Sequence, residues 1–245
     1  MLRAFDDGRL FGESFGSGPA TVLALPGWMR QRGDFEAVLT GASAVALDLP
    51  GFGGAVAEPP QAWGAAEYAE AVRPVLAAMA ERIVVVGHSF GGRVAVHLAA
   101  SHPERVAGVV LTGVPLLKRC DQPSTRAPVA FRVARALHGK GLVSDARMER
   151  MRRAHGSADY RAASGVMRDV LVRVVNETYE PQLAAIAAPV ELVWGADDDA
   201  VPVEVAERAA RLVSQATLTV VPGVGHFLPV RRPDVLREAI ERVAP

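Results

Sequence analysis

The stretch Arg82-Ile83-Val84-Val85-Val86-Gly87-His88-Ser89-Phe90-Gly91-Gly92 decides the fold of this chain. Its β-branched run predicts a buried strand, and the alanine-rich sequence after it predicts a helix. Between the two, residues 87–91 read G-x-S-x-G, which in a strand–turn–helix setting raises the serine hydroxyl clear of the sheet. The two glycines are needed because a Cβ atom there would collide with the opposite arm of the turn. We therefore predict that Ser89 is a nucleophile on a strained turn.

Further strands are predicted on both sides of this stretch by short apolar runs. These runs cover residues 21–25, 43–47, 106–111, 190–194 and 217–221. Two alternating segments, 2–5 and 10–15, predict a hairpin across the turn Asp6-Asp7-Gly8-Arg9. The strands alternate with helical patterns, which is typical of an α/β fold with a mostly parallel sheet and helices on both faces.

The predicted helices follow from apolar residues at intervals of three and four. They cover residues 34–39, 65–80, the segment from the serine turn to 101, 203–213 and 235–243. Pro74 should kink or break the helix at 65–80, because proline lacks the N–H that an interior helical position donates. Pro233 suits the first turn of the last helix, where that N–H is not needed.

Strand-like runs disappear between residues 114 and 181, where Arg, Ala and Met recur at helical spacing. We therefore predict an α/β core formed by residues 1–113 and 182–245, with a helical cap formed by 114–181. Residues 118–178 hold 13 Lys and Arg against 6 Asp and Glu, a net charge of +7. The excess either pairs with the acidic remainder of the chain or attracts an anionic substrate. The arginines that could clamp a carboxylate are Arg119, Arg126, Arg153, Arg161 and Arg168.

Overall composition narrows the class of protein. Half of the 245 residues are hydrophobic, and 27 Lys and Arg balance 27 Asp and Glu. This balance indicates neither a nucleic-acid nor a membrane-surface partner, and no stretch approaches the length of a membrane span. The single Cys120, together with the lack of a signal-peptide pattern, leads us to expect a cytoplasmic protein. The six histidines have no metal-ligand spacing, so we expect no metal and no cofactor. The oligomeric state stays open.

A serine hydroxyl needs a neighbouring base, and the base needs an acid that orients it. His226 lies in a glycine-rich loop after the last predicted strand, and three consecutive acids, Asp197, Asp198 and Asp199, follow the strand at 190–194. Parallel sheets place such strand ends at one edge. His226 is therefore the predicted base and one of the three acids its partner. We expect His88, although adjacent to Ser89, to point away from the serine's face.

Taken together, these motifs resemble the α/β-hydrolase superfamily over essentially the whole chain. The resemblance is carried by Pro26-Gly27-Trp28, Asp48-Leu49-Pro50-Gly51-Phe52-Gly53, residues 87–92, 195–202 and Gly225-His226. It implies the acid-loop register G-x-x-D-x-x-x-P, in which Gly195 and Pro202 select Asp198. It also implies an oxyanion hole formed by the backbone N–H groups of Trp28 and Phe90. Relatives often have His where this chain has Pro26, which changes the support of that hole but not its donors. The Asp48 loop is interpreted as structural.

The resemblance implies a hydrolase that works through an acyl-enzyme, and we expect a carboxylic ester or lactone as its substrate. The alternative is a C–C bond hydrolase or lyase of the meta-cleavage or menaquinone-pathway type, whose carboxylate-bearing substrates would suit a basic cap. Such enzymes often have Trp after the catalytic His, where this chain has Phe227. A non-catalytic receptor of the same fold is a third hypothesis, but receptors usually lack a member of the triad. Ser89 in place of Asp argues against dehalogenases and epoxide hydrolases.

Overall fold

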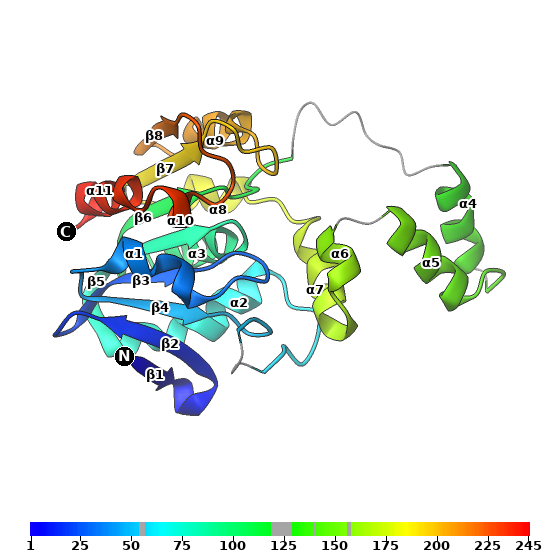
Figure 1. Cartoon of the computed structure of the whole chain (residues 1–245), viewed down its shortest axis with the longest axis horizontal. Helices are drawn as coiled ribbons and strands as arrows, with labels where there is room; N and C mark the ends of the chain where they lie inside the picture. The colour runs from blue at the N-terminus through cyan, green and yellow to red at the C-terminus, as the bar shows by residue number, and fades with distance from the viewer. Residues whose placement is uncertain (54–56, 119–128, 140, 156–157) are drawn as a thin grey trace.

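The computed structural model describes residues 1–53, 57–118, 129–139, 141–155 and 158–245. Its described residues form an eight-stranded sheet in the order β1-β2-β4-β3-β5-β6-β7-β8 (Figure 1). The strands are β1 (Leu2–Phe5), β2 (Leu10–Phe15), β3 (Ala20–Leu25), β4 (Ala44–Asp48), β5 (Met79–His88), β6 (Val106–Thr112), β7 (Val190–Gly195) and β8 (Ala216–Val221). β2 runs antiparallel to both β1 and β4, and the remaining neighbours are parallel. The predicted α/β fold is confirmed.

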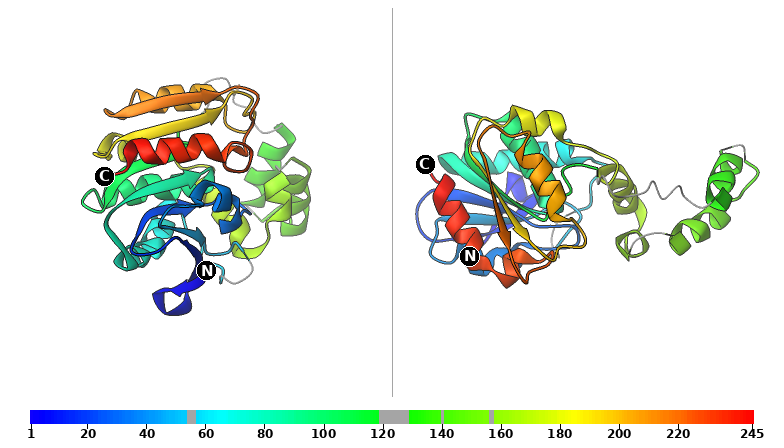
Figure 2. Two further views of the ribbon diagram at one scale, coloured as in Figure 1. Left: turned by 60° about the vertical axis from the view of Figure 1, so that its left-hand side comes forward. Right: turned by 90° about the horizontal axis from the view of Figure 1, so that it is seen from above.

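Helices cover both faces of the sheet (Figures 1 and 2). One face is covered by α2 (Ala65–Val72), α3 (Phe90–Ser101), α8 (Glu180–Ala185) and α9 (Val203–Ala210), and the other by α1 (Glu36–Leu39), α10 (Leu228–Arg231) and α11 (Pro233–Val243). Side chains of β5 alternate between the two layers: Ile83 and Val85 belong to the first core, Val84 and Val86 to the second. Both faces of this part of β5 are buried, which explains the unbroken apolar run from Ile83 to Val86.

The largest departure from the predicted elements lies in the helix at residues 65–80, whose second half is wrong. The α-helix ends at Val72, a 3₁₀ segment runs from Arg73 to Ala78, and Met79 already begins β5. Pro74 lies at the start of the 3₁₀ segment. It cannot donate an interior helical hydrogen bond, so the chain leaves the α-helix there. Met79 therefore contributes to the core from the sheet rather than from a helix.

Between the core strands β6 and β7 the described residues form helices and no strand. They are α4 (Val129–His138), α5 (Asp145–His155), α6 (Ala158–Ala162), α7 (Gly165–Val174) and α8. α4 packs against α5 and α6 against α7, whereas α8 packs against α3 of the core. Figure 2 shows α4 and α5 as a pair apart from the sheet. Residue 181 falls inside α8. The division into core and cap stays a prediction.

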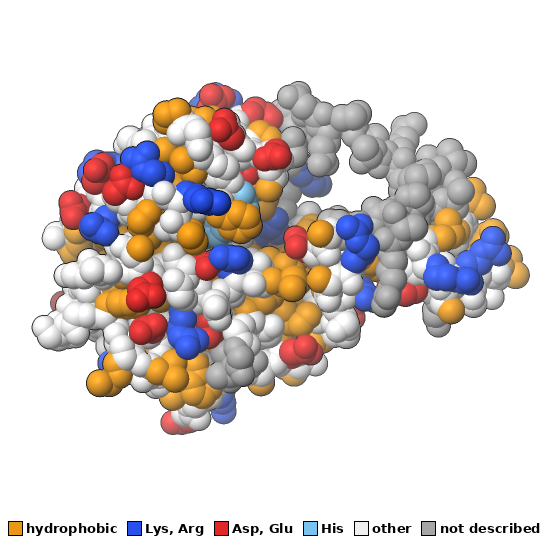
Figure 3. Space-filling model, viewed as in Figure 1, with side chains coloured by type: hydrophobic (Ala, Val, Ile, Leu, Met, Phe, Trp, Pro, Cys, Tyr) orange, Lys and Arg blue, Asp and Glu red, His pale blue; other side chains and the backbone are white. Residues whose placement is uncertain are grey.

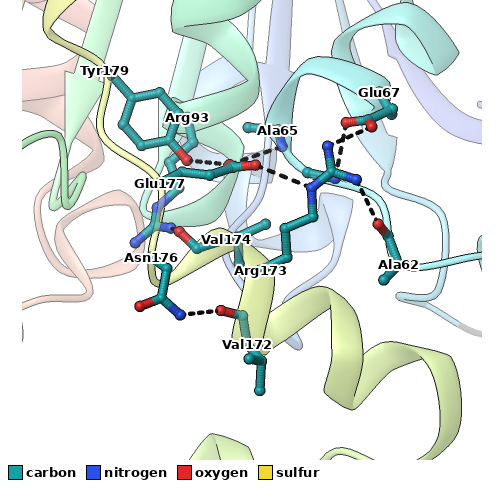
Figure 4. Close-up of polar contacts among 11 residues, drawn as sticks. Ala62, Ala65, Glu67, Arg93, Val172, Arg173, Val174, Asn176, Glu177 and Tyr179 are labelled. Atoms are coloured by element: carbon teal, nitrogen blue, oxygen red, sulfur yellow. Dashed lines mark hydrogen bonds and ion pairs between the residues drawn. The ribbon is translucent and has the colours of Figure 1, made fainter.

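A network of polar side chains ties the end of α7 to the start of α2 (Figure 4). The Arg173 guanidinium donates to Glu67 Oε1 at 2.5 Å. Glu177 Oε2 accepts from the backbone N–H of Ala65 at 3.1 Å and from the Tyr179 hydroxyl at 2.9 Å. The carboxylate at the first amide of α2 also suits the positive end of that helix. One of the basic residues of the predicted cap is thus engaged by the core.

Candidate active site

The serine turn lies between β5 and α3 and has the strain that its sequence predicts. Ser89 has φ 49° and ψ −112°, a backbone conformation that a residue with a Cβ atom rarely adopts. A Cβ atom on Gly87 would collide with the Cα of Gly92, on the opposite arm, as expected. A Cβ atom on Gly91 would instead collide with the carbonyl oxygen of Leu25. The second glycine is therefore required by the end of the neighbouring strand β3.

The acid loop follows β7 and holds Asp198 in a buried position. Its side chain is 1% exposed, and Oδ1 accepts the backbone N–H of Val201 at 2.8 Å. Trp194 closes the same loop, since its indole N–H donates to the Val201 carbonyl oxygen at 2.8 Å. The second oxygen, Oδ2, lies 2.9 Å from Nδ1 of His226. The structure thus brings the predicted acid and the predicted base into direct contact.

The two neighbouring acids are placed differently, since Asp197 and Asp199 are both exposed. Asp197 contributes through its backbone, whose N–H donates to the Val224 carbonyl oxygen at 2.9 Å and joins the acid loop to the loop that carries His226. Among the three candidates, the geometry favours the register in which Asp198 meets the histidine.

The protonation of the His226 ring follows from its partner. An ionised carboxylate can only accept a hydrogen bond, so Nδ1 of His226 carries the proton and donates to Asp198. The other nitrogen, Nε2, is then left with its lone pair. The ring is half-buried, with 19% of the side chain exposed. Such an imidazole is suited to accept a proton from a nucleophile.

Gly113, directly after β6, leaves room for the His226 ring and the Asp198 carboxylate. A Cβ atom there would lie 2.9 Å from His226 Nδ1 and 3.2 Å from Asp198 Oδ2. The preceding residue, Thr112, accepts the backbone N–H of Ser89 at 3.0 Å. The serine turn and the base therefore contact adjacent residues at the end of β6. Our sequence analysis missed Gly113, although a glycine directly after a buried strand was an available signal.

The residues expected to form an oxyanion hole also lie together. Phe90 is the first residue of α3, Trp28 follows β3, and their ring centroids are 5.6 Å apart. Within the described ranges, neither backbone N–H of this pair donates to a protein acceptor. The Phe90 amide also lies at the positive end of a twelve-residue helix. Two such donors can stabilise negative charge on an oxygen.

His88 was expected to point away from the serine's face, and that expectation overlooked its contact with the base. Its Nε2 lies 2.9 Å from the carbonyl oxygen of His226, and the two ring centroids are 4.9 Å apart. Burial lowers the pKa of His88 to about 4, because it penalises the charged form of the ring. Its position as the last residue of the strand before Ser89 was the signal available in the sequence.

Of the five arginines proposed as anion ligands, the structure describes the side chains of two. Arg119, Arg126 and the side chain of Arg153 lie outside the described residues, and Arg161 lies in α6. Arg168 is engaged elsewhere: it donates to Glu149 Oε1 at 2.5 Å. The guanidinium of Arg168 is therefore held by a carboxylate of α5.

The surface beside the histidine loop is apolar and basic. Exposed hydrophobic side chains include Met29, next to Trp28, and Phe227, next to His226. The guanidinium of Arg30 lies 5.1 Å from the Phe227 ring centroid and pairs with Asp34 at 2.5 Å. Figure 3 shows histidine side chains reaching the surface among hydrophobic and basic ones.

Metal and membrane features were searched over the same described ranges. No cluster of three His, Cys, Asp or Glu side chains there could hold a metal ion. No helix there combines the length and the apolar character that crossing a bilayer requires.

Several known proteins to which this chain is similar are named as hydrolases. The chain is 26% identical to the pimeloyl-[acyl-carrier protein] methyl ester esterase of Edwardsiella ictaluri (strain 93-146), over 92% of its own length and 93% of the esterase. It is 28% identical to the 2-hydroxy-6-oxononadienedioate/2-hydroxy-6-oxononatrienedioate hydrolase of Cupriavidus pinatubonensis over 60% of its length and 56% of that enzyme. It spans 64% of RutD of Caulobacter sp. (strain K31).

A solved thermophilic esterase from Thermogutta terrifontis shares the fold with a TM-score of 0.70 at 22% identity, each chain covering all of the other. The model of the alpha/beta hydrolase family matches residues 22–239, which include the serine turn, the acid loop and the histidine loop. The chain is a hydrolase that belongs to the alpha/beta hydrolase family.

Proposed function

We propose that this protein is a serine hydrolase of carboxylic esters or lactones, with Ser89, His226 and Asp198 as its triad. The observation that carries the proposal is the 2.9 Å contact between His226 Nδ1 and the buried Asp198. The strained turn that holds Ser89 at the end of β5 supports it. The curated esterase that aligns over 93% of its own length supports the choice of an ester. The exposed apolar side chains of Met29 and Phe227 beside the proposed site support an organic ester of small to medium size.

In the proposed mechanism, Ser89 Oγ attacks the ester carbonyl carbon while Nε2 of His226 takes the serine proton. The carbonyl oxygen becomes an oxyanion, which accepts hydrogen bonds from the backbone N–H groups of Trp28 and Phe90. His226 then gives its proton to the leaving alcohol, and an acyl-enzyme on Ser89 remains. Water, activated by His226, releases the carboxylic acid and restores the serine. Asp198 holds the imidazole and stabilises its cationic form in both steps.

We also propose that residues 114–181 act as a cap over a core formed by 1–113 and 182–245. Two contacts support this: α7 reaches the core through Arg173, and Met167 of α7 lies where a Cβ atom on Gly51 would be. Because the Asp48–Gly53 loop follows β4 at the same edge of the sheet as the serine turn, α7 lies near the proposed site. A cap in this position would select the substrate.

The proposed ester hydrolysis is tested with p-nitrophenyl esters of graded chain length and a vinylogous C–C substrate. We expect turnover of at least one ester, with a kcat/KM well above that for the C–C substrate, and no turnover by Ser89→Ala. The second candidate, C–C bond hydrolysis, is favoured by the relative named for a dioate substrate. If the protein turns over the C–C substrate and none of the esters, C–C bond hydrolysis replaces ester hydrolysis as the proposed function.

The basic cap leads to a prediction about substrate charge. A net charge of +7 over residues 118–178 attracts anions at long range, and salt screens this attraction over a Debye length of about 10 Å at 0.1 M. Of two esters matched in size, the one with a distal carboxylate should have the higher kcat/KM at low salt. Its advantage should shrink at about 0.5 M salt. A preference for the neutral ester at every salt concentration would show that the arginines serve contacts within the protein.

A further inference from the structure

A buried histidine outside the proposed triad connects the parts of the site. His88 is the last residue of β5 and only 2% exposed. Its Nε2 lies 2.9 Å from the backbone carbonyl oxygen of His226. A carbonyl oxygen can only accept, so Nε2 carries the proton and donates, and Nδ1 carries the lone pair. The contact therefore requires one particular tautomer of the His88 ring.

The same ring packs against the glycine that precedes the proposed oxyanion donor. A Cβ atom on Gly27 would lie 3.0 Å from Nδ1 of His88 and 3.3 Å from the Cβ atom of Ser89. One imidazole thus touches the loop after β3 and the loop after β8, and it adjoins the serine in sequence. These are the segments that carry the proposed donor, base and nucleophile.

A polar side chain at position 88 lowers the stability of the fold, and an apolar side chain could fill the same space without this loss. Its Nδ1 is buried and has no hydrogen-bond partner among the described residues. A buried polar atom without a partner destabilises a fold, whereas an apolar side chain of similar shape would avoid that cost. The ring also stays neutral at neutral pH, because burial lowers its pKa to about 4. What the fold gains from this histidine is the hydrogen bond to the carbonyl of His226.

We propose that His88 is a positioning residue for the base: its Nε2–H fixes the backbone of His226 and so the distance between the imidazole and Ser89. This inference rests on the proposed function. Small displacements of a catalytic group lower the rate strongly, since a shift of about 1 Å costs on the order of 100-fold. Losing the donor should therefore reduce kcat and leave KM nearly unchanged, because His88 would not touch the substrate.

Two substitutions separate the hydrogen bond from the shape of the ring. His88→Phe keeps a planar ring and removes the donor, whereas His88→Gln places an amide N–H as many bonds from Cα as the histidine Nε2. We expect His88→Phe to lower kcat about 10- to 100-fold per active site titrated with a phosphonate, and His88→Gln to recover most of that loss. His97→Phe is the matched control. His97 lies in α3 with its ring 5.6 Å from that of Tyr179, away from the site, so its kcat should match the wild type.

A second measurement does not depend on activity or on the folding of a variant. Long-range ¹H–¹⁵N NMR of the wild-type imidazoles reports the tautomer of each histidine, and His88 should be neutral with its proton on Nε2. An Nδ1–H tautomer, or a His88→Phe variant with wild-type kcat per titrated site, would overturn the inference. If the phosphonate fails to label the wild type and no substrate is turned over, the proposed function fails instead, and the tautomer still decides whether the hydrogen bond exists.

Discussion

If the proposed function holds, replacement of Ser89 with alanine will reduce kcat for the preferred ester by about 10⁶-fold, as loss of the nucleophile does in a serine protease. Without Oγ no acyl-enzyme forms, and the acid–base pair has no proton to transfer. An organophosphonate probe will add its mass to the wild type and not to Ser89→Ala, which intact mass spectrometry measures directly. Ser101→Ala, an exposed position at the end of α3, is the matched control and should be labelled like the wild type.

This first prediction distinguishes a catalytically active triad from a non-catalytic protein of the same fold. The backbone strain at Ser89 arises because a residue with a Cβ atom adopts a positive φ there. Alanine has the same Cβ atom, so Ser89→Ala should have the same stability as the wild type. A thermal unfolding experiment checks that point. Labelling that persists in Ser89→Ala, or that maps to another serine, would reject Ser89 as the nucleophile.

Replacement of Asp198 with asparagine will lower kcat by about 10⁴-fold. An amide directed at Nδ1 of His226 can donate a hydrogen bond, which favours the tautomer with its proton on Nε2, and that tautomer cannot accept the serine proton. The asparagine oxygen can still accept the Val201 N–H, so the loop should keep its shape. The kcat of purified variants measures the effect, and their unfolding temperatures check the fold.

The neighbouring acids provide controls of the same chemistry. Asp197 and Asp199 are exposed, and the side-chain contact to His226 is made by Asp198. Asp197→Asn and Asp199→Asn should therefore change kcat less than about threefold, since isolated surface charges contribute little. A loss in either variant that equals the loss in Asp198→Asn would show that the acid loop has a different register in the working enzyme.

Local patterns in the sequence were sufficient to predict the fold, and they also named the candidate site residues, whose roles stay predictions. Buried parallel strands read as apolar runs, and the serine turn has a sequence dictated by the space around its backbone, as the collision at Gly87 illustrates. Both signals act over a few residues, so they can be read without knowing what the chain packs against. The predicted break at Pro74 is confirmed, whereas the predicted boundary between this helix and the next strand was wrong, because a 3₁₀ segment follows the break and β5 begins at Met79.

Tertiary structure was required to establish which side chains distant in the chain are in contact. Three consecutive acids look alike in the sequence, apart from the register that the family resemblance implied, and only packing buries Asp198 against His226 while the other two stay exposed. Arg168 likewise looked like a free cation until its pairing with Glu149 was visible. The contact of His88 with the carbonyl of a residue 138 positions later has no local sequence signal. Hydrogen bonds and burial between strand ends depend on how the sheet and its loops assemble in space. The periodicity of residues along the chain reports only local structure, so it cannot predict the distances between these ends.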